Sequence, residues 1–320
     1  MSQSERPVVA VGVPCYNRPE MLDQCLRSLR AQTYPALSIL ISDNASTDPG
    51  VEAVGRRHAA EDARVRYVRQ ERNVGMVANF EYVLVNSNAP YFMWASDDDW
   101  HEPDFVERCV DCLEKEGESV VSVVTEARLE MPDGTFEFFN QGEAFRTFRS
   151  DSAAERLAHT IWHNYSIQFY SVHRRSALFH DGRPLTYWWG KARAEHSMIF
   201  MFAGKGNTVT LPGASFHKRT RRINCELLKW AVYGGWFPKK KIRQRATRLL
   251  KHLRKVGLAR QDHENVIEAL KLDEASKAHV GAALDRTSRR DTWAALTGWQ
   301  APQDYVKQAR QAGPQPQLDS

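Results

Sequence analysis

The sequence predicts an α/β protein whose core is a mostly parallel sheet with helices on both faces, followed by a helical C-terminal extension. Two observations carry this prediction. Apolar segments with strand and helix periodicity alternate through about the first 125 residues, and from about residue 226 the pattern is mainly helical. Parallel strands need long crossover connections, which are usually helical and right-handed, so the alternation favours an open parallel sheet.

The expected strands are short β-branched or aromatic runs, and the expected helices carry apolar residues three and four positions apart. Asn17 is a plausible cap of the first helix, with Pro19 in its first turn. A turn signal at 132–134 predicts a hairpin of residues 120–129 with 135–139. The earlier elements, in chain order, are strand 8–13, a helix with Leu22, Cys25, Leu26 and Leu29, strand 37–42, helix 51–63, strand 65–68, a helix with Met76, Phe80, Val83 and Leu84, strand 91–94 and helix 103–116.

Composition and length bound the class of protein. Of the 320 residues, 42% are hydrophobic and 26% charged, which is typical of globular chains and excludes a wholly disordered or collagen-like one. No apolar run approaches the roughly eighteen residues of a membrane span. The first residues lack the features of a signal peptide, and five cysteines do not resemble a disulfide framework. We therefore expect a cytoplasmic protein with a domain of residues 1–225 and an extension of residues 226–320.

Polar residues follow four of the predicted strands, namely Tyr16, Asp43, Asn73 and the run 97–99. In open parallel sheets, ligands bind outside the carboxyl ends of the strands. Three adjacent carboxylates repel one another, and a divalent cation that bridges to phosphate oxygens would balance them. The alternative for this triplet is a solvated helix start, in which the helix dipole favours the carboxylates.

The other strand ends also allow two interpretations. Asp43 is either an ordinary turn or cap residue, or a carboxylate that accepts the ring N–H of a uracil-type base. Asn73 and Gly75 form either a plain loop, or a place where the backbone approaches a ribose or a phosphate closely. The two cysteines 109 and 112 share a predicted helix with apolar residues and have no second pair, so we expect core cysteines and no zinc site.

Taken together, these segments resemble glycosyltransferase family 2, inverting enzymes with the GT-A fold, which is Rossmann-like. The resemblance covers about residues 7–125 strongly and 160–225 weakly. It rests on four segments in the right order and spacing, which are Val-Pro-Cys-Tyr-Asn-Arg at 13–18, Asp-Asn-Ala-Ser-Thr-Asp at 43–48, Asn73-Val74-Gly75 with Ala78 and Asn79, and Ser-Asp-Asp-Asp-Trp at 96–100 followed by Pro103-Asp104-Phe105.

The resemblance implies metal-dependent transfer of a sugar from a nucleotide-diphosphate donor to a glycan acceptor, which many relatives carry on a lipid. A uridine or thymidine donor is favoured, since it suits the carboxylate at position 43. The implied nucleotide-binding residues are Pro14, Tyr16, Arg18, Asp43, Asn73, Gly75, Asp97 and Asp98. The implied ligands of Mn²⁺ or Mg²⁺ are Asp99, Asp97 and His217.

An inverting displacement needs a general base opposite the leaving diphosphate. The family usually has an acidic pair at the start of a helix, and the best match here is Glu195-His196, with His where Asp is common. Either residue is a candidate base, and Glu195 is favoured as the retained carboxylate. Trp188 and Trp189, just upstream, are either an aromatic wall for the acceptor sugar or buried packing residues.

A basic segment spans residues 218–261, with fifteen Lys and Arg and one acidic residue, whereas the whole chain carries only +5. Apolar residues within 239–260 share one face of a predicted helix. Such a helix can lie on an anionic membrane, which would make the protein peripheral at the inner face. It can equally pack its apolar stripe on the catalytic domain.

Three other functions compete with the transferase. An inactive nucleotide-sugar-binding relative is suggested by the departure at His196. A sugar-phosphate nucleotidylyltransferase should show a Gly-rich loop after the first strand, and residues 14–17 are not one. A nucleic-acid-binding protein acting through residues 218–261 would not explain the acidic edge of the sheet, so nucleic acid is disfavoured as a partner.

Overall fold

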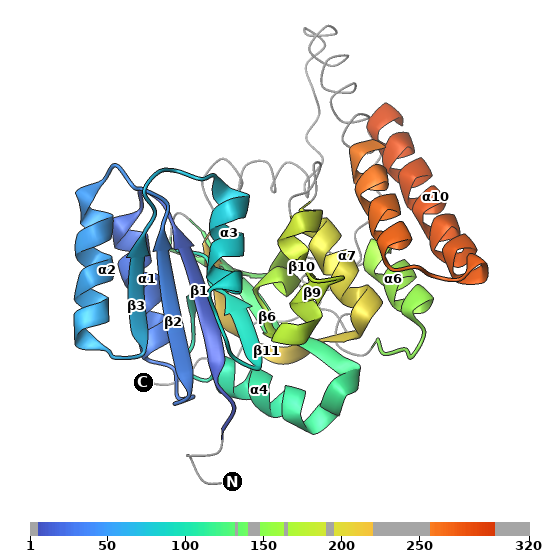
Figure 1. The fold of residues 1–320 in the computed structure, drawn as a ribbon. Coiled ribbons are helices and arrows are strands. Elements are labelled where there is room, and N and C mark those ends of the chain that lie inside the picture. Colours follow the sequence, from blue (N-terminus) through green and yellow to red (C-terminus); the bar gives the residue numbers. More distant parts are fainter. Residues whose placement is uncertain are drawn as a thin grey trace, which may run out of the picture.

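The computed structural model describes residues 6–131, 134–139, 148–162, 166–189, 195–219 and 257–297 (Figure 1). Strands and helices alternate along its first part as predicted, with ends that shift by a few residues. These elements are β1 (Val9–Cys15), α1 (Pro19–Arg30), β2 (Leu37–Asp43), α2 (Pro49–Glu61), β3 (Val65–Arg69), α3 (Met76–Val85), β4 (Tyr91–Trp94), β5 (Trp100–His101) and α4 (Phe105–Glu116).

Within the described residues, one sheet contains nine strands. The strand order begins at one edge with β3, β2, β1 and β4. The three pairings between these neighbouring strands are all parallel, which confirms the predicted open parallel sheet. The sheet continues through β8 (Val172–Arg174), β6 (Val120–Glu130), β11 (Asn207–Arg219) and β5. The predicted hairpin is confirmed, because β7 (Phe136–Phe139) pairs antiparallel with β6.

The two faces of the sheet bury different helices (Figure 1). Successive strand residues point to opposite faces, so Val9, Val11 and Val13 join one core and Ala10 joins the other. The first core is covered by α1, α2 and α4. The second is covered by α3, α6 (Ala153–Trp162) and α7 (His196–Lys205). Helix α3 lies so close that a Cβ on Gly12 would stand 2.5 Å from the Val83 side chain.

The predicted cap of α1 is wrong. The residue before the helix is Arg18, and its side chain makes no capping hydrogen bond. Asn17 instead has a φ of 55°, and its amide oxygen accepts the N–H groups of Thr47 (2.7 Å) and Asp48 (3.1 Å). The left-handed backbone turns this side chain toward the loop after β2, so Asn17 joins two strand ends rather than starting a helix.

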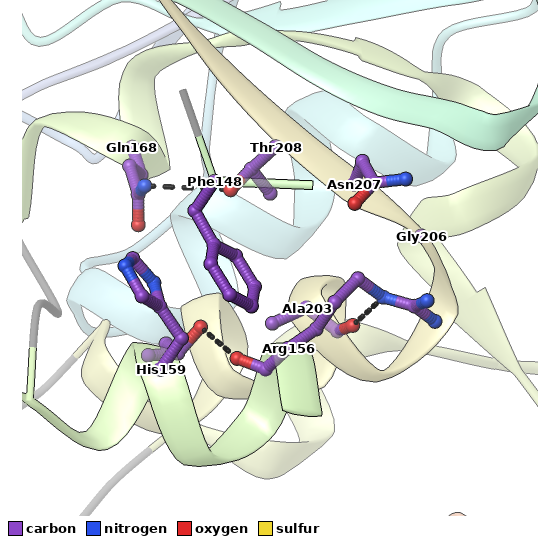
Figure 2. Close-up of a pocket in the computed structure, with 9 residues that line it drawn as sticks. Phe148, Arg156, His159, Gln168, Ala203, Gly206, Asn207 and Thr208 are labelled. Carbon is purple, nitrogen blue, oxygen red and sulfur yellow. Dashed lines mark hydrogen bonds between the residues drawn. The ribbon is translucent and has the colours of Figure 1, made fainter. Parts of the chain in front are cut away.

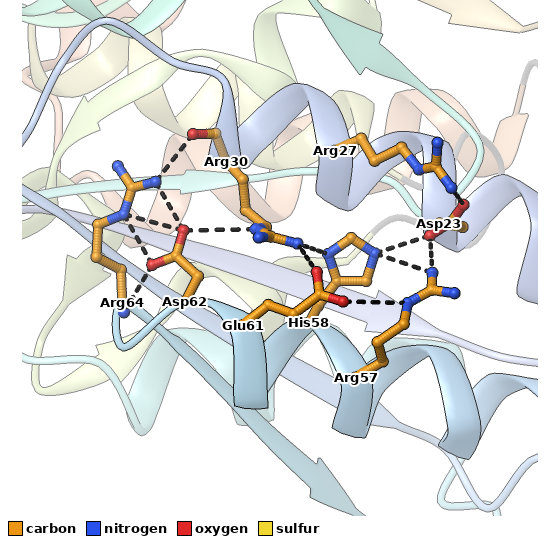
Figure 3. Close-up of polar contacts among 8 residues, drawn as sticks. All are labelled: Asp23, Arg27, Arg30, Arg57, His58, Glu61, Asp62 and Arg64. Atoms are coloured by element: carbon orange, nitrogen blue, oxygen red, sulfur yellow. Dashed lines mark hydrogen bonds and ion pairs between the residues drawn. The ribbon is translucent and has the colours of Figure 1, made fainter.

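Helices α1 and α2 are joined by a charged network (Figure 3). The buried ring of His58 lies between Asp23 and Arg30, at 2.8 Å from the Asp23 carboxylate and 3.0 Å from the Arg30 guanidinium. Because Arg30 only donates, the ring nitrogen facing it must accept, and the other nitrogen donates to Asp23. The network therefore fixes the packing of two helices on the same face of the sheet.

The C-terminal part is helical where the structure describes it, at 257–269 and in α10 (Glu274–Thr297). Val266, Val280 and Leu284 share the second core with α6 and α7, so these helices pack on the sheet domain (Figure 1). Residues 226–256 lie outside the described part, and the domain boundary at residue 225 stays a prediction. Of the two cysteines predicted to pack in the core, Cys109 is fully buried and Cys112 is partly buried against the first core.

Candidate active site

The acidic triplet lies between β4 and β5, at the carboxyl end of the central strand β4. Asp97 and Asp99 are almost fully buried, at 1% and 2% exposure. Buried carboxylates of like charge require cations or hydrogen-bond donors nearby. The surrounding loops supply both.

Arg18 neutralises the first half of the triplet. Its guanidinium lies 2.5 Å from Asp97 and also contacts Asp98. The backbone N–H of Tyr16 donates to the second oxygen of Asp97 at 3.3 Å. Burial raises the pKa of Asp97 to about 7, although the Arg18 charge acts in the opposite direction. The loop after β1 is thus joined to the loop after β4, as the strand order predicts.

Asp99 contacts the end of β11 instead. Its Oδ1 accepts the backbone N–H of Arg219 at 3.0 Å, and its Oδ2 lies 3.4 Å from the Lys218 ammonium. Burial raises the pKa of Asp99 to about 6, against the effect of the Lys218 charge. A segment 119 residues away in the sequence therefore completes the acidic edge.

Lys218 links this edge to the predicted base. Its ammonium lies 4.4 Å from the centre of the Tyr170 ring, in the geometry of a cation–π contact. Burial lowers the pKa of Lys218, but Tyr170, Asp99, Asp98 and Glu195 outweigh that effect and hold it above its ordinary value. Glu195, the residue that precedes α7, is thus close enough to act on the same ammonium. Tyr170 was not among the site residues that the sequence predicted.

Asp43 ends β2 and is fully buried. Its Oδ2 accepts the Tyr67 hydroxyl at 2.7 Å and contacts Arg69 at 3.1 Å, while its Oδ1 accepts the Ser46 N–H at 2.8 Å. Tyr67 and Arg69 come from β3, the neighbouring strand, and were not predicted as site residues. Arg69 could have been found from the sequence, since it is the last residue of its strand at the same edge.

The loop between β3 and α3 lies beside the loop after β2. The Asn44 side chain donates to Asn73 at 3.0 Å and accepts the N–H of Val74 at 2.8 Å. Gly75 follows with a φ of 86°, which other residues rarely adopt, and a Cβ there would meet no atom. Asn73 and Gly75 are therefore brought to the edge that holds Asp43, with the half-exposed ring of Tyr16 and the buried Pro14 on β1.

His217, the predicted metal ligand, contacts a carboxylate and an aromatic ring of the chain. Its Nε2 lies 2.8 Å from the Glu102 carboxylate, and its ring stacks on Trp100 with the centroids 3.6 Å apart. The reason is strand register, because His217 pairs directly with Trp100 across β11 and β5. Burial lowers the pKa of His217. These contacts hold the His217 ring beside Trp100, the residue that follows the triplet, and the role of His217 at a metal stays a prediction.

Two of the three aromatic residues before α7 are packed. Trp189 contacts the rings of Phe80 and Phe169, each at 5.5 Å, and Trp188 contacts the ring of His180 at 5.6 Å. Tyr187 beside them is 62% exposed. The buried-packing interpretation suits Trp189, and the most exposed ring in this segment belongs to a residue that the sequence did not single out.

A pocket lies elsewhere, between α6, α7 and the start of β11 (Figure 2). Arg156 lines it and donates to the carbonyls of Ala203 at 2.7 Å and Gly204 at 3.2 Å. Arginine in this position satisfies the last carbonyls of α7, which otherwise lack partners. Arg156 therefore serves the packing of α6 on α7. The pocket lies at the start of β11, whereas the acidic triplet contacts the opposite end of that strand.

Within the described residues, no three His, Cys, Asp or Glu side chains form a group that could hold a metal by themselves. A magnesium-type site needs less, since one or two carboxylates suffice when phosphate oxygens complete the shell. Asp99 suits such an ion, because its carboxylate is buried and one of its oxygens has only the 3.4 Å contact with a lysine. The donor chemistry thus fits a divalent cation shared with a phosphate ligand.

The basic segment is mostly outside the described residues, which exclude 220–256. The proposed membrane helix at 239–260 and its alternative therefore both stay predictions. Among the helices that the structure does describe, none has the length and apolar composition needed to cross a bilayer.

Comparison with known proteins shows the family of the chain and agrees with its fold. Residues 10–176, more than half of the chain, match the family model described as glycosyl transferase family 2. GlyA, a glycosyltransferase of Streptococcus pneumoniae, is 29% identical over 47% of this chain and 20% of its own length. Chondroitin synthase of Escherichia coli is 32% identical over 34% of this chain and 16% of its own length. The chain thus spans about a fifth or less of these two relatives.

Among solved structures, S. aureus TarS 1-349 in complex with UDP-GlcNAc has a TM-score of 0.51. The match covers 91% of this chain and 92% of that one at 13% sequence identity. At this identity the likeness concerns the fold, and it confirms the predicted GT-A architecture.

Proposed function

The chain belongs to glycosyl transferase family 2, and we propose that it moves a sugar from a nucleoside-diphosphate donor to a hydroxyl of a glycan acceptor, with inversion. One observation carries the proposal. The acidic triplet contacts Lys218 at the carboxyl edge of the parallel strands, where such folds bind nucleotides, and the charge of Glu195 acts on the same lysine. Three points remain predictions from the sequence: that the acceptor is a glycan, that it is linked to a lipid, and that residues 239–260 contact a membrane.

The nucleotide would lie over the ends of β1 and β2. The half-exposed Tyr16 ring and the loop of Asn73 and Gly75 border this place, and Asp43 lies at its base. A uridine or thymidine base suits the carboxylate of Asp43, and the relative TarS was solved with UDP-GlcNAc, which supports a uridine donor. Arg69 and Tyr67 would orient that carboxylate, since both contact its Oδ2.

The diphosphate would lie at the acidic triplet with Arg18 and Lys218. Asp99, with Asp97, would hold a divalent cation, Mn²⁺ or Mg²⁺, which when bound neutralises charge on the leaving diphosphate. Lys218 and Arg18 would add positive charge at the same edge, and charged hydrogen bonds to phosphate are among the strong ones.

Glu195 would act as the general base. Its carboxylate takes the proton of the acceptor hydroxyl while that oxygen bonds to the anomeric carbon, and the bond from that carbon to the diphosphate oxygen breaks. Its electrostatic effect on Lys218 supports a position near the edge of the sheet that holds the acidic triplet. His196, the first residue of α7, is the alternative base.

Thermal unfolding with nucleotides tests the donor. UDP, dTDP, GDP, CDP and ADP are each added to the full chain with and without Mn²⁺. A ligand at about a hundred times its Kd stabilises the native state by about 2.7 kcal/mol, so a bound nucleotide raises the midpoint measurably. We expect a metal-dependent rise with UDP or dTDP. A chain that no nucleotide stabilises would contradict the proposal.

Two variants test the base. E195Q should retain donor binding and lose transfer, because the amide cannot take a proton, whereas H196A should retain both. The measurement is nucleotide release from the donor in the presence of acceptor glycans. Loss of transfer in H196A alone would assign the base to His196. Nucleotide binding by a wild-type chain that never turns over would favour the inactive relative.

A further inference from the structure

Every carboxylate of the acidic triplet already has partners within the chain. Asp97 and Asp98 share the guanidinium of Arg18, and Asp98 also accepts the Ser96 hydroxyl. Asp99 has the backbone N–H of Arg219 and the ammonium of Lys218. Two cations of the chain, Arg18 and Lys218, therefore neutralise the carboxylates that a metal ion would otherwise neutralise.

These two cations are held differently. Arg18 contacts two carboxylates with a rigid planar group. Lys218 is a point charge on a flexible stem, its side chain is 26% exposed, and its contact with Asp99 is longer, at 3.4 Å. The face of Tyr170 supports the ammonium from another side, at 4.4 Å. Lys218 can therefore leave its carboxylate for another anion more easily than Arg18 can leave Asp97 and Asp98.

We propose that Lys218 is a built-in counter-ion that holds the metal's place at Asp99 in the free protein and moves to the donor's diphosphate when nucleotide and metal enter. The proposal rests on the nucleotide-sugar function given above. A divalent ion that arrives alone must displace the Lys218 ammonium from the buried carboxylate of Asp99. The displaced ammonium then lies beside the ion and repels it. A diphosphate removes that repulsion, because it gives the ammonium a new anionic partner.

The consequence is positive coupling between metal and nucleotide. If each ligand binds better after the other, the free-energy coupling is reciprocal and commonly amounts to between about 5- and 150-fold in affinity. Lys218 would add to the coupling that the direct attraction between metal and diphosphate already provides, so its removal should strengthen binding of the metal alone and weaken the coupling. A residue that only supported the fold would do neither.

The test is Mn²⁺ binding to the full chain, followed by the loss of the electron paramagnetic resonance signal of free Mn²⁺. Wild type, K218M and K218Q are titrated with Mn²⁺ alone and again with saturating UDP. The control is K271M, since the Lys271 side chain is 77% exposed and pairs with Asp181. Far-ultraviolet circular dichroism checks the fold of each variant, and K218Q replaces K218M if the latter does not fold.

We expect wild type and K271M to bind Mn²⁺ alone weakly, and UDP to tighten this binding about ten-fold or more. The Lys218 variants should bind Mn²⁺ alone about ten-fold more tightly, and UDP should tighten their binding by a smaller factor than it does in wild type. Equal Mn²⁺ affinities in wild type and the Lys218 variants without UDP, including no detectable binding by any of them, would overturn the proposal. Failure of UDP and the other nucleotides to bind at all would refute the nucleotide-sugar function instead, and the Mn²⁺-only comparison would still report on Lys218.

Discussion

Replacement of His173 by glutamine should remove part of the acid sensitivity of the fold. His173 lies on β8 with 1% exposure, in the second core. One ring nitrogen lies 2.8 Å from the Ser122 hydroxyl and the other 3.1 Å from the Phe169 carbonyl. The nitrogen that faces the carbonyl must donate, and in the neutral ring the other nitrogen accepts from the hydroxyl. Burial lowers the pKa of His173 from 6.5 to about 4.

The size of the effect follows from these two values. A group whose pKa is lower in the folded state binds fewer protons there, so the free energy of unfolding falls as the pH falls. Between about pH 7.5 and about pH 5, the unfolded chain gains nearly one proton at this site and the folded chain almost none. With about 1.4 kcal/mol per pKa unit, the free energy of unfolding falls by about 2 kcal/mol from this residue alone.

Urea denaturation at several pH values between these limits measures the effect. Glutamine does not titrate, yet it offers one donor and one acceptor for Phe169 and Ser122. H173Q should be less stable than wild type near pH 7.5, because it loses ring packing against Phe202. It should nevertheless lose about 2 kcal/mol less than wild type on acidification. H279Q, which changes an exposed ring, is the control. An identical pH dependence in wild type and H173Q would refute the reasoning.

Two further predictions concern the packing of helices on the sheet. G12A should lower the free energy of unfolding by about 2 kcal/mol, because the new methyl would lie 2.5 Å from Val83; urea denaturation measures it, and wild-type stability would mean that α3 can move away. D23N should lower the free energy of unfolding by about 1 kcal/mol, because it weakens the contacts of residue 23 with His58 and Arg27 at a partly exposed site (Figure 3). The matched control is E274Q at an exposed pair, and equal thermal shifts in both variants would contradict a special role for the network.

Much of the architecture is determined by local features of the sequence. The alternation of β-branched runs with helical spacing predicts β1 to β4 in order, because side-chain periodicity reports which face of an element is buried. The polar residues that end these strands, such as Asp43 and Asp97, must share one edge once the strands are parallel. The family could be identified from the same four segments, since their order follows the order of the strands.

The sequence did not determine which side chains meet at that edge. Lys218 and Asp99 are 119 residues apart, and their contact depends on β11 lying antiparallel to β5. The same register directs His217 to Glu102 and Trp100. The cap expected at Asn17 failed for a related reason, because its best partners lie on another strand's loop.

The difference has a physical cause. Local propensity and periodicity are properties of a few neighbouring residues, so they can be read along the chain. A contact between two strand ends depends on strand order, direction and register, which are decided by packing across the whole sheet. The sequence by itself therefore determined the fold class and the edge of the sheet at which the candidate site lies. Only the tertiary structure decided that Lys218 of β11 lies beside Asp99 and balances its charge.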